Sequence, residues 1–528
     1  MSTLVSLYCE ENSLYAFEKV FDGKSAFQKV LEWAEKIPES EIAVFLTEKN
    51  KSSVLSQIEE KKISLVERNS WNLKEFLEES YNIAEKTESS DVIFSFADVP
   101  FINTALTEEI YSRHKKYNAE YSFADGYPYG LSPEILAKDA VKILFNLAEK
   151  NPLYSGKEKI ERTSLFSLLK TEINSFEIET VISQNDFRMN RLSFECSSKQ
   201  GFISCKNLFK MNIPFENAEE ISLNAVKNID VLKTVPSYYS VQISEKCSGK
   251  CFFCPYSEKI TGKKSENFMD FKKFSNLVKE ISSFSGSAVI SLSSWGEALF
   301  HPEFEMFVSE ILKYEGLSVL LETDGLLIDE KLCESLQRLA KEKKGFASFP
   351  KIMWIVALDS FSPEKYSEIR GLEKENYFTA LNSVKILEKY FPNAVYPQMT
   401  RLNQNEDELE SFYRFWSAKD SFSSGNLIVQ KYDDFSKFLP DLRSSDISPL
   451  ERNVCWHLLR DMNIFYDGEV SLCHEVLKNQ DEKLILGNVF TDGIEKIWKK
   501  QTEFAEMHIE EKYIEKCRKC DEFYTFNF

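Results

Sequence analysis

Apolar and polar positions follow two different periods along this chain. Over residues 1 to about 235, short apolar runs at 42–46 and 92–96 alternate with stretches of helical spacing at 26–37 and 73–86. Runs of about five apolar residues are typical of buried strands, and apolar residues recurring every three to four positions are typical of helices. This region is therefore predicted to be an α/β sandwich.

From about residue 236 to residue 445, a strand followed by a helix repeats six times. Such repeats predict a parallel sheet that curves as a partial (β/α)6, TIM-like barrel. In this architecture the chemistry gathers at the carboxyl ends of the strands. The predicted strands are 239–243, 288–292, 318–322, 353–358, 395–400 and 427–431, and the helices between them include 270–283, 303–314, 330–341, 377–389 and 406–418.

The last region, from about 446 to 528, contains short elements and four of the 11 cysteines. It is predicted to be a small domain held together by a metal site. The segment 436–446 is the expected boundary before it. The chain is thus predicted to have three domains, at 1–235, 236–445 and 446–528.

Composition and charge narrow the class of protein. The 65 basic and 84 acidic residues leave a net charge of −19, which repels phosphate backbones and argues against a general nucleic-acid binder. No apolar run of about 18 residues predicts a membrane helix, and the start MSTLVSLYCEEN lacks the signal-peptide pattern, so a cytoplasmic location is expected. There thiols stay reduced, and clustered cysteines indicate metal or redox chemistry.

Three cysteines cluster directly after the first predicted barrel strand. The segment ISEKCSGKCFFCPYS places Cys247, Cys251 and Cys254 in a C-x3-C-x2-C spacing. Three thiolates on one loop can hold three irons of a [4Fe–4S] cluster and leave the fourth iron for a small molecule. Structural zinc needs four ligands, and the nearest further Cys or His downstream is His301.

This loop resembles the signature of the radical S-adenosylmethionine (SAM) superfamily. The resemblance implies that the open iron of a [4Fe–4S] cluster binds SAM. It further implies that an electron from the cluster cleaves SAM to methionine and a 5′-deoxyadenosyl radical, which takes a hydrogen atom from a substrate. Cys247, Cys251 and Cys254 are then the catalytic cluster ligands, and Phe253 is implied to lie near the adenine.

Motifs after the loop match the same superfamily in the same order. SSWGEALFHP resembles its GGEP motif, with Trp295 and Ala298 replacing the first glycine and the proline. Gly296 and Glu297 are thereby implied to hold the SAM amino group. ALDSFSPEKYSEIRG resembles the SLDG…R stretch, so Arg370 is implied to pair with the SAM carboxylate.

Other positions of the resemblance depart from the pattern or match it less fully. Ala357 stands where the superfamily often has a SAM-contacting serine, and Glu322 to Gly325 replaces its TNG motif. Gln398 and Arg401, at the end of the fifth strand, are further candidates for the SAM pocket.

The C-terminal region offers four more thiolates, from Cys455, Cys473, Cys517 and Cys520. A fully ligated auxiliary [4Fe–4S] cluster is the simplest use, and a zinc site with four cysteines stays open on spacing alone. The segments NVCWHL, YDGEV, LGN and IW around them resemble the SPASM/twitch extension of radical SAM enzymes. Because only eight residues follow Cys520, one auxiliary cluster is expected rather than two, with a role in electron transfer.

The N-terminal region resembles nucleotidyltransferases with a GT-A-like fold. FSFADVPFINTALTEEIYSRH places Asp98 at their metal-binding aspartate, and YPYGLSPEIL matches Gly130 and Glu134 of a second element. Glu195 is the best-placed second acid. Because the glycine-rich phosphate loop is missing after the first strand, a degenerate domain that binds rather than transfers is expected.

The whole arrangement resembles the spiro-SPASM proteins. The leading hypothesis is a radical SAM oxidoreductase or modifying enzyme acting on a peptide or protein, or on a carbohydrate or nucleotide-linked substrate. An electron donor such as flavodoxin or ferredoxin is implied, and no membrane partner is expected. The alternatives are a nucleotidyltransferase with an iron–sulfur appendage and a non-catalytic, metal-stapled scaffold.

Overall fold

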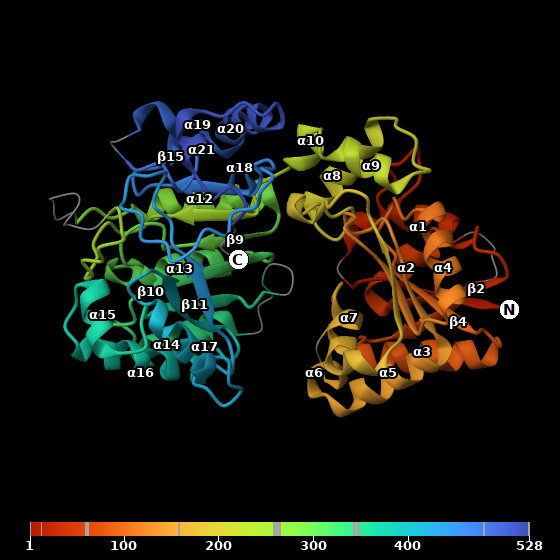
Figure 1. Ribbon diagram of the computed structural model, residues 1–528. Helices are drawn as coiled ribbons and strands as arrows, with labels where there is room; N and C mark the ends of the chain where they lie inside the picture. The colour runs from red at the N-terminus through yellow and green to blue at the C-terminus, as the bar shows by residue number, and fades with distance from the viewer. Residues whose placement is uncertain are drawn as a thin grey trace. The chain divides into compact units, whose positions relative to one another are not determined.

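The computed structural model describes residues 2–11, 13–58, 63–156, 159–256, 266–341, 345, 349–478 and 481–525. The chain divides into two compact units, Met1–Thr234 and Val235–Phe528 (Figure 1). Among the helices of these residues, none combines the length and the apolarity that a membrane crossing requires.

Seven strands of the described N-terminal unit form one sheet in the order β3-β2-β1-β4-β6-β5-β7. β1, β2, β3 and β4 run parallel, whereas β6 is antiparallel to its neighbours. The strands are β1 (Thr3–Tyr8), β2 (Ser40–Thr47), β3 (Ile63–Arg68), β4 (Asp91–Phe96), β5 (Tyr121–Asp125), β6 (Glu134–Ala137) and β7 (Ile178–Ile182). The helices are α1 (Ala26–Ala34), α2 (Glu48–Leu55), α3 (Leu73–Lys86), α4 (Thr104–Tyr117), α5 (Lys138–Lys150), α6 (Pro152–Ser155), α7 (Ser164–Leu169), α8 (Lys199–Lys210), α9 (Ala218–Ala225) and α10 (Ile229–Leu232).

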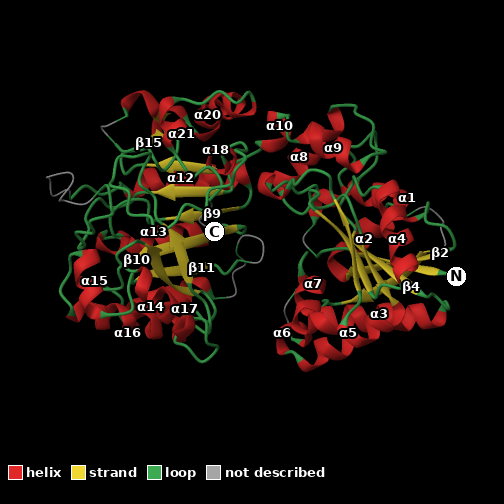
Figure 2. Ribbon diagram, viewed as in Figure 1, coloured by secondary structure: helices red, strands yellow, loops and turns green. Residues whose placement is uncertain are grey.

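Side chains that alternate along β1 enter two separate cores. Val5 and Leu7 pack with residues of α1, α4 and α8, whereas Leu4 and Tyr8 pack with residues of α3, α5 and α7. Successive side chains of a strand point to opposite faces, so a sheet with apolar residues at every position needs helices on both sides. Figure 2 shows this arrangement, which confirms the predicted α/β sandwich.

The two helices that sequence spacing predicts in this unit, at 26–37 and 73–86, are both present as α1 and α3. α3 has the predicted bounds, and its start is fixed by a capping box in which Asn72 and Glu75 exchange hydrogen bonds. α1 ends at Ala34, before the predicted end at 37, because the chain turns there through residues Glu35 to Ile37.

The C-terminal unit contains a larger sheet in the order β13-β12-β11-β10-β9-β8-β14-β15-β16 within the described chain. β8 to β13 are consecutive parallel neighbours, which confirms the predicted strand–helix repeat. Since β13 and β16 lie at opposite edges, this sheet is an open, partial barrel. Its strands are β8 (Tyr238–Val241), β9 (Ala288–Ser291), β10 (Leu317–Thr323), β11 (Ile352–Ala357), β12 (Val395–Arg401), β13 (Ile428–Lys431), β14 (Asp461–Ile464), β15 (Glu469–Ser471) and β16 (Ile485–Asn488).

Helices follow these strands in the predicted order. The helices are α12 (Phe271–Ser285), α13 (Phe304–Leu312), α14 (Glu330–Ala340), α15 (Pro363–Arg370), α16 (Glu375–Tyr390), α17 (Leu409–Trp416), α18 (Trp456–Arg460), α19 (Val489–Asp492), α20 (Ile494–Ile509) and α21 (Glu515–Lys519).

The C-terminal segment extends the sheet of the barrel. β14 pairs in parallel with β8, with Asp461 opposite Tyr238, and β15 and β16 follow in antiparallel pairs. The ranges 236–445 and 446–528 therefore share one sheet and one compact unit, and the domain boundary near residue 445 stays a prediction.

Candidate functional site

The cysteine loop follows β8 at its carboxyl end, as the sequence predicts. Cys251 is buried, Cys254 is partly buried and Cys247 is exposed. Burial raises the pKa of the Cys254 thiol to about 12, and the charges of Cys251 and Cys247 add to this shift. The three thiols therefore lie close enough to influence one another, and a bound metal would have to stabilise the thiolates that burial disfavours.

Backbone hydrogen bonds hold this loop from the segments that follow two other strands of the sheet, β9 and β11. Lys250 N donates to Arg370 O at 2.9 Å, at the end of α15, which follows β11. Glu297 N donates to Lys246 O at 2.7 Å from the loop after β9. Segments far apart in the sequence thus converge on the cysteines, and each carries one of the predicted SAM-binding residues.

Gly296 permits the closest of these approaches. Its φ angle is +83°, and a Cβ at this position would lie 2.2 Å from the carbonyl oxygen of Ser244. A side chain there has no room, and its backbone conformation is one that glycine adopts most readily. The glycine retained in the motif therefore fixes how the loop after β9 packs on the loop after β8.

Replacing Gly296 by alanine is expected to destabilise the C-terminal unit by about 2–4 kcal/mol, because the Cβ meets rigid backbone. Chemical denaturation of the full chain measures this loss. Gly425→Ala is the matched control, since Gly425 has φ +92° in the same unit but its nearest contact would be 3.3 Å away. Equal stabilities for the two variants would contradict the proposed tight packing.

Glu297 is 3% exposed, and its carboxylate is hydrogen-bonded from several sides. Its carboxylate accepts hydrogen bonds from Thr323 Oγ1 at 3.0 Å, Asp324 N at 2.9 Å and Leu299 N at 3.2 Å. Burial, together with the charge of Asp324, raises the pKa of Glu297 to about 8. A carboxylate that is costly to ionise in isolation gains most from a cationic partner, such as the amino group of SAM.

Arg370 is 7% exposed, and Asp359 fixes its orientation. Arg370 Nη1 donates to Asp359 Oδ2 at 2.6 Å, while Asp359 Oδ1 accepts from Thr400 N at 2.8 Å. Arg370 Nε is buried and has no hydrogen-bond partner among the described residues. A buried guanidinium N–H without an acceptor is unusual, and it fits a carboxylate ligand.

Aromatic residues line one side of the cysteine loop. Phe253 and Trp295 belong to an apolar cluster that also contains Phe435 and Leu477. Trp295 stacks on Tyr256 with ring centroids 5.4 Å apart and also contacts Phe435 at 5.4 Å. The tryptophan that replaces the first glycine of the motif therefore packs the loop against the segment after β13.

Two of the further candidates have partners within the protein. Arg401 Nε and Nη2 both donate to the Glu406 carboxylate, at 2.8 Å and 2.6 Å, and both residues are partly exposed. Gln398 is buried and donates to Glu322 Oε1 at 3.3 Å. Ala357 is buried at the end of β11.

The C-terminal cysteines line a single cavity. His457, His474 and Glu475 also line it. Burial raises the pKa of Cys455 to about 12 and that of Cys517 to about 11. The fold brings together four cysteines from three separate segments of the chain: Cys455, Cys473, Cys517 and Cys520.

Among the described residues, the groups of three or more ligand atoms that lie within 4.8 Å of one another contain no cysteine. Four cysteines suit a fully ligated [4Fe–4S] cluster and also tetrahedral zinc, so the lining of the cavity fits both groups.

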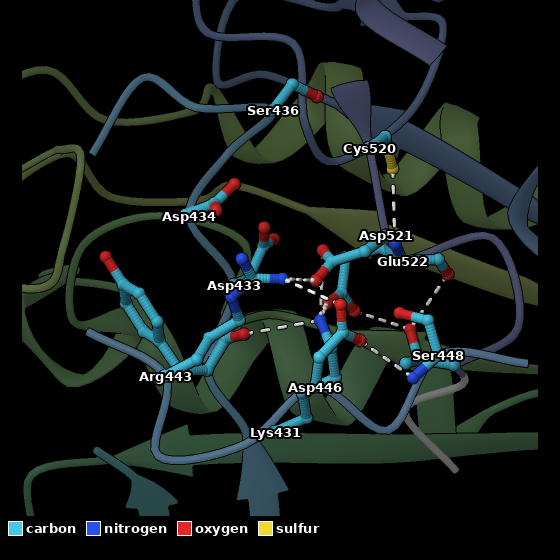
Figure 3. A network of polar contacts seen from close by, with 12 residues as sticks. Lys431, Asp433, Asp434, Ser436, Arg443, Asp446, Ser448, Cys520, Asp521 and Glu522 are labelled. Carbon is cyan, nitrogen blue, oxygen red and sulfur yellow. Dashed lines mark hydrogen bonds and ion pairs between the residues drawn. The ribbon is translucent and has the colours of Figure 1, made fainter. Parts of the chain in front are cut away.

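Charged side chains form a polar network beside Cys520, one of the cysteines that line the cavity (Figure 3). Lys431 Nζ contacts Glu522 and lies 3.0 Å from Asp521, which Arg443 also contacts at 3.0 Å. Glu522 N donates to Cys520 Sγ at 3.3 Å. This network ties the segment after β13 to the last pair of cysteines, and sequence spacing gave no sign of it.

Ion pairs also fix the two histidines beside the cavity. Burial disfavours the cation of His474, but its hydrogen bond to Asp433, with the charges of Glu475 and Glu522, raises its pKa to about 9. His457 Nδ1 bonds instead to Asp461 at 2.6 Å.

The N-terminal candidates meet around a residue that sequence reasoning missed. Asp98 and Glu195 both contact Arg162, an arginine in the loop before α7 that belongs to no recognised motif. Glu134 lies apart from them on β6, where burial raises its pKa to about 7. Gly130 has φ +91° in the turn before β6.

Comparisons with known proteins fall on the same regions. A family model described as "Radical SAM superfamily" matches residues 241–415, and one described as "Iron-sulfur cluster-binding domain" (SPASM) matches residues 455–521. An uncharacterized protein of Treponema pallidum (strain Nichols) is 37% identical over 370 residues, which are 69% of this chain and 98% of that protein. An S-adenosyl-L-methionine-dependent 2-deoxy-scyllo-inosamine dehydrogenase of Niallia circulans is 26% identical over 144 residues, 26% of this chain and 53% of the enzyme.

Solved structures also resemble parts of the chain. "Native anSMEcpe with bound AdoMet" covers 55% of this chain and 88% of its own, with 17% identity and a TM-score of 0.40. A cytidylyltransferase from Leptospira borgpetersenii covers 43% of this chain and 94% of its own, with 14% identity and a TM-score of 0.36.

Proposed function

Because this chain belongs to the radical SAM superfamily and carries a SPASM iron–sulfur domain, we propose that it cleaves SAM reductively and uses the 5′-deoxyadenosyl radical to modify or oxidise a substrate. The resemblance noted from the sequence is thereby confirmed, and its two domains imply a SAM-binding [4Fe–4S] cluster and an auxiliary cluster. One observation carries the proposal further. The cysteine loop is hydrogen-bonded to the segments that carry Glu297 and Arg370, after β9 and β11, and Arg370 Nε has no acceptor among the described residues.

Cys247, Cys251 and Cys254 would hold the SAM-binding cluster, leaving one iron without a protein ligand. When bound, this cluster supplies the electron that divides SAM into methionine and the 5′-deoxyadenosyl radical. The chain shields part of this site from water: Cys251 is 8% exposed, and the aromatic cluster around Phe253 covers one side of the loop.

Glu297 and Arg370 orient SAM in this proposal. Glu297 accepts the amino group, and Gly296 allows the backbone to approach closely enough for that contact. Arg370 offers its unpaired Nε–H to the SAM carboxylate, while Asp359 holds the opposite edge of the guanidinium. Phe253 contacts the adenine. These pairings match the amino group and the carboxylate of SAM each with a buried residue of opposite charge.

Cys455, Cys473, Cys517 and Cys520 would fully ligate the auxiliary cluster. With every iron bound by cysteine, this cluster transfers electrons and does not bind the substrate directly. On the barrel side, the site of this cluster borders the segment after β13. Phe435 in that segment packs against Trp295. That continuous packing supports a role in accepting an electron from the substrate during an oxidation.

A peptide or a carbohydrate is the proposed substrate class, with a flavodoxin or ferredoxin as electron donor in the cytoplasm. The similarity to the Niallia circulans dehydrogenase, which its name places on a cyclic amino alcohol, supports oxidation of an alcohol carbon. Removal of two electrons and two protons would convert that alcohol to a ketone. In that oxidation the substrate would give up one hydrogen atom to the radical derived from SAM, one electron to the cluster that Cys455, Cys473, Cys517 and Cys520 would hold, and the hydroxyl proton to solvent.

Replacing Arg370 by alanine is expected to weaken SAM binding by about 10- to 100-fold, because a buried, charge-assisted hydrogen bond is lost. The measurement is an electron paramagnetic resonance titration of the reduced, reconstituted protein with SAM. Asp359→Ala is expected to weaken binding less, since it acts only through the orientation of Arg370. Arg414→Ala, which removes an exposed pair with Glu410, is the control. Unchanged SAM affinity in Arg370→Ala would remove Arg370 from the proposed site.

A further inference from the structure

The N-terminal unit contains a second polar centre, at the carboxyl ends of β1 and β4. The order β3-β2-β1-β4 places these two strands side by side at the point where the strand order reverses. In open α/β sheets, ligands bind in the crevice outside the strand ends at such a point. Glu10 and Asp98 each follow the end of their strand by two residues, so both carboxylates lie at this crevice.

Backbone packing brings a third carboxylate to the same place. A Cβ on Gly130 would lie 2.5 Å from Phe194 O, so the turn before β6 rests directly on the segment around Phe194. Two residues further along, Cys196 N donates to Asp98 O at 2.9 Å. Glu195 lies between these two contacts and is therefore held beside Asp98.

The guanidinium of Arg162 fills the centre of this crevice. Nη1 and Nη2 fork onto the two carboxylate oxygens of Asp98 at 2.8 Å and 2.7 Å. Nη2 also lies 3.2 Å from Glu10, and Nε lies 3.3 Å from Glu195. The guanidinium carbon is 3.8 Å from the centroid of the Phe96 ring. Each nitrogen of the guanidinium thus faces a carboxylate, and its flat face is covered.

The spacing of the carboxylates suits this planar cation and not a metal ion. In the described part of the chain, Glu10, Asp98 and Glu195 are absent from the groups whose ligand atoms lie within 4.8 Å of one another. Divalent cations need oxygen ligands at about 2.1–2.5 Å, which brings those oxygens closer together. Arg162 and the nearby Lys159 carry two positive charges, which do not balance the three carboxylates. The remaining negative charge repels phosphate.

We propose that Arg162 is the permanent occupant of this crevice and stands where a divalent cation and its nucleotide would bind. The N-terminal unit in its native state is then closed to metal–nucleotide complexes and has no nucleotidyltransferase activity. The planar, always-charged fork of arginine is suited to this task, because it meets a carboxylate with two parallel hydrogen bonds.

The full reconstituted chain tests this with Mn²⁺ plus CTP as the probe. The melting temperature of the wild type is expected to stay unchanged, and no pyrophosphate is expected when sugar phosphates are added. A rise in melting temperature that Asp98→Asn removes would overturn the proposal, as would pyrophosphate release. This arm needs no arginine variant, so it does not depend on whether one folds.

The second arm measures what Arg162 contributes. Arg162→Gln is expected to lower the melting temperature by about 5–10 °C, because it leaves three carboxylates without their shared cation. Arg188→Gln, which removes an exposed arginine from Asp125 and Asp186, is the matched control and is expected to change it little. Equal melting temperatures for the two variants would contradict a filled crevice.

Discussion

A variant with alanine at Cys247, Cys251 and Cys254 is expected to hold about four irons where the wild type holds about eight, and to cleave no SAM. The reason is that these three thiols lie on one loop. The cavity at the auxiliary site is lined by four other cysteines, and no further described cysteine lines it. Removing all three leaves no partial site that could rebuild a cluster. Iron and sulfide analysis after anaerobic reconstitution measures the loss.

The auxiliary cluster provides the internal control for that variant. Because its ligands come from a separate cavity, the remaining four irons should keep their absorption spectrum. Cys333→Ala is a second control, since Cys333 is buried on α14 and has no ligand role. Wild-type iron content in the triple variant would show that the cysteine loop does not hold a cluster. Loss of every iron would show that the two sites are not independent.

The complementary variant, with alanine at Cys455 and Cys473, is expected to lose the other four irons and all substrate oxidation while it still cleaves SAM. These two thiols lie on the barrel side of the cavity, next to α18 and after β15, and removing both leaves two ligands at most. SAM cleavage should persist because Glu297 and Arg370 belong to the other site.

Metal analysis of this variant also decides between cluster and zinc. About one zinc per wild-type chain, lost in the variant, would contradict the auxiliary cluster. Loss of SAM cleavage along with the irons would contradict the proposed separation of the two sites. An unchanged iron content would show that Cys455 and Cys473 are not ligands.

The sequence predicted the elements of the fold closely, because their apolar periods are local. The six barrel strands lie within a few residues of their predicted positions, and α3 has its predicted bounds. The pairing of β14 with β8 was missed, since a register between Asp461 and Tyr238 leaves no trace in local spacing. The segment after residue 445 thus contributes strands to the barrel sheet, and the domain boundary near residue 445 stays a prediction.

The candidate site was predictable where a motif carries it and not elsewhere. Cysteine spacing located the loop, but Asp359 was missed because it acts only through its contact with Arg370. Arg162 was missed for a similar reason: it lies in a loop without a pattern and reaches Asp98 only in the folded chain. Trp295 was read as a departure from a glycine motif, and the structure gives it a packing partner in Tyr256.

The most direct test of the central claim is the product of SAM in the anaerobically reconstituted, reduced wild-type protein. Liquid chromatography with mass spectrometry should detect 5′-deoxyadenosine and methionine in equal amounts, formed only when SAM, reductant and the cysteine loop are all present. The same preparation of Cys251→Ala should form neither product. Absence of 5′-deoxyadenosine from the wild type, with its irons intact, would contradict the account.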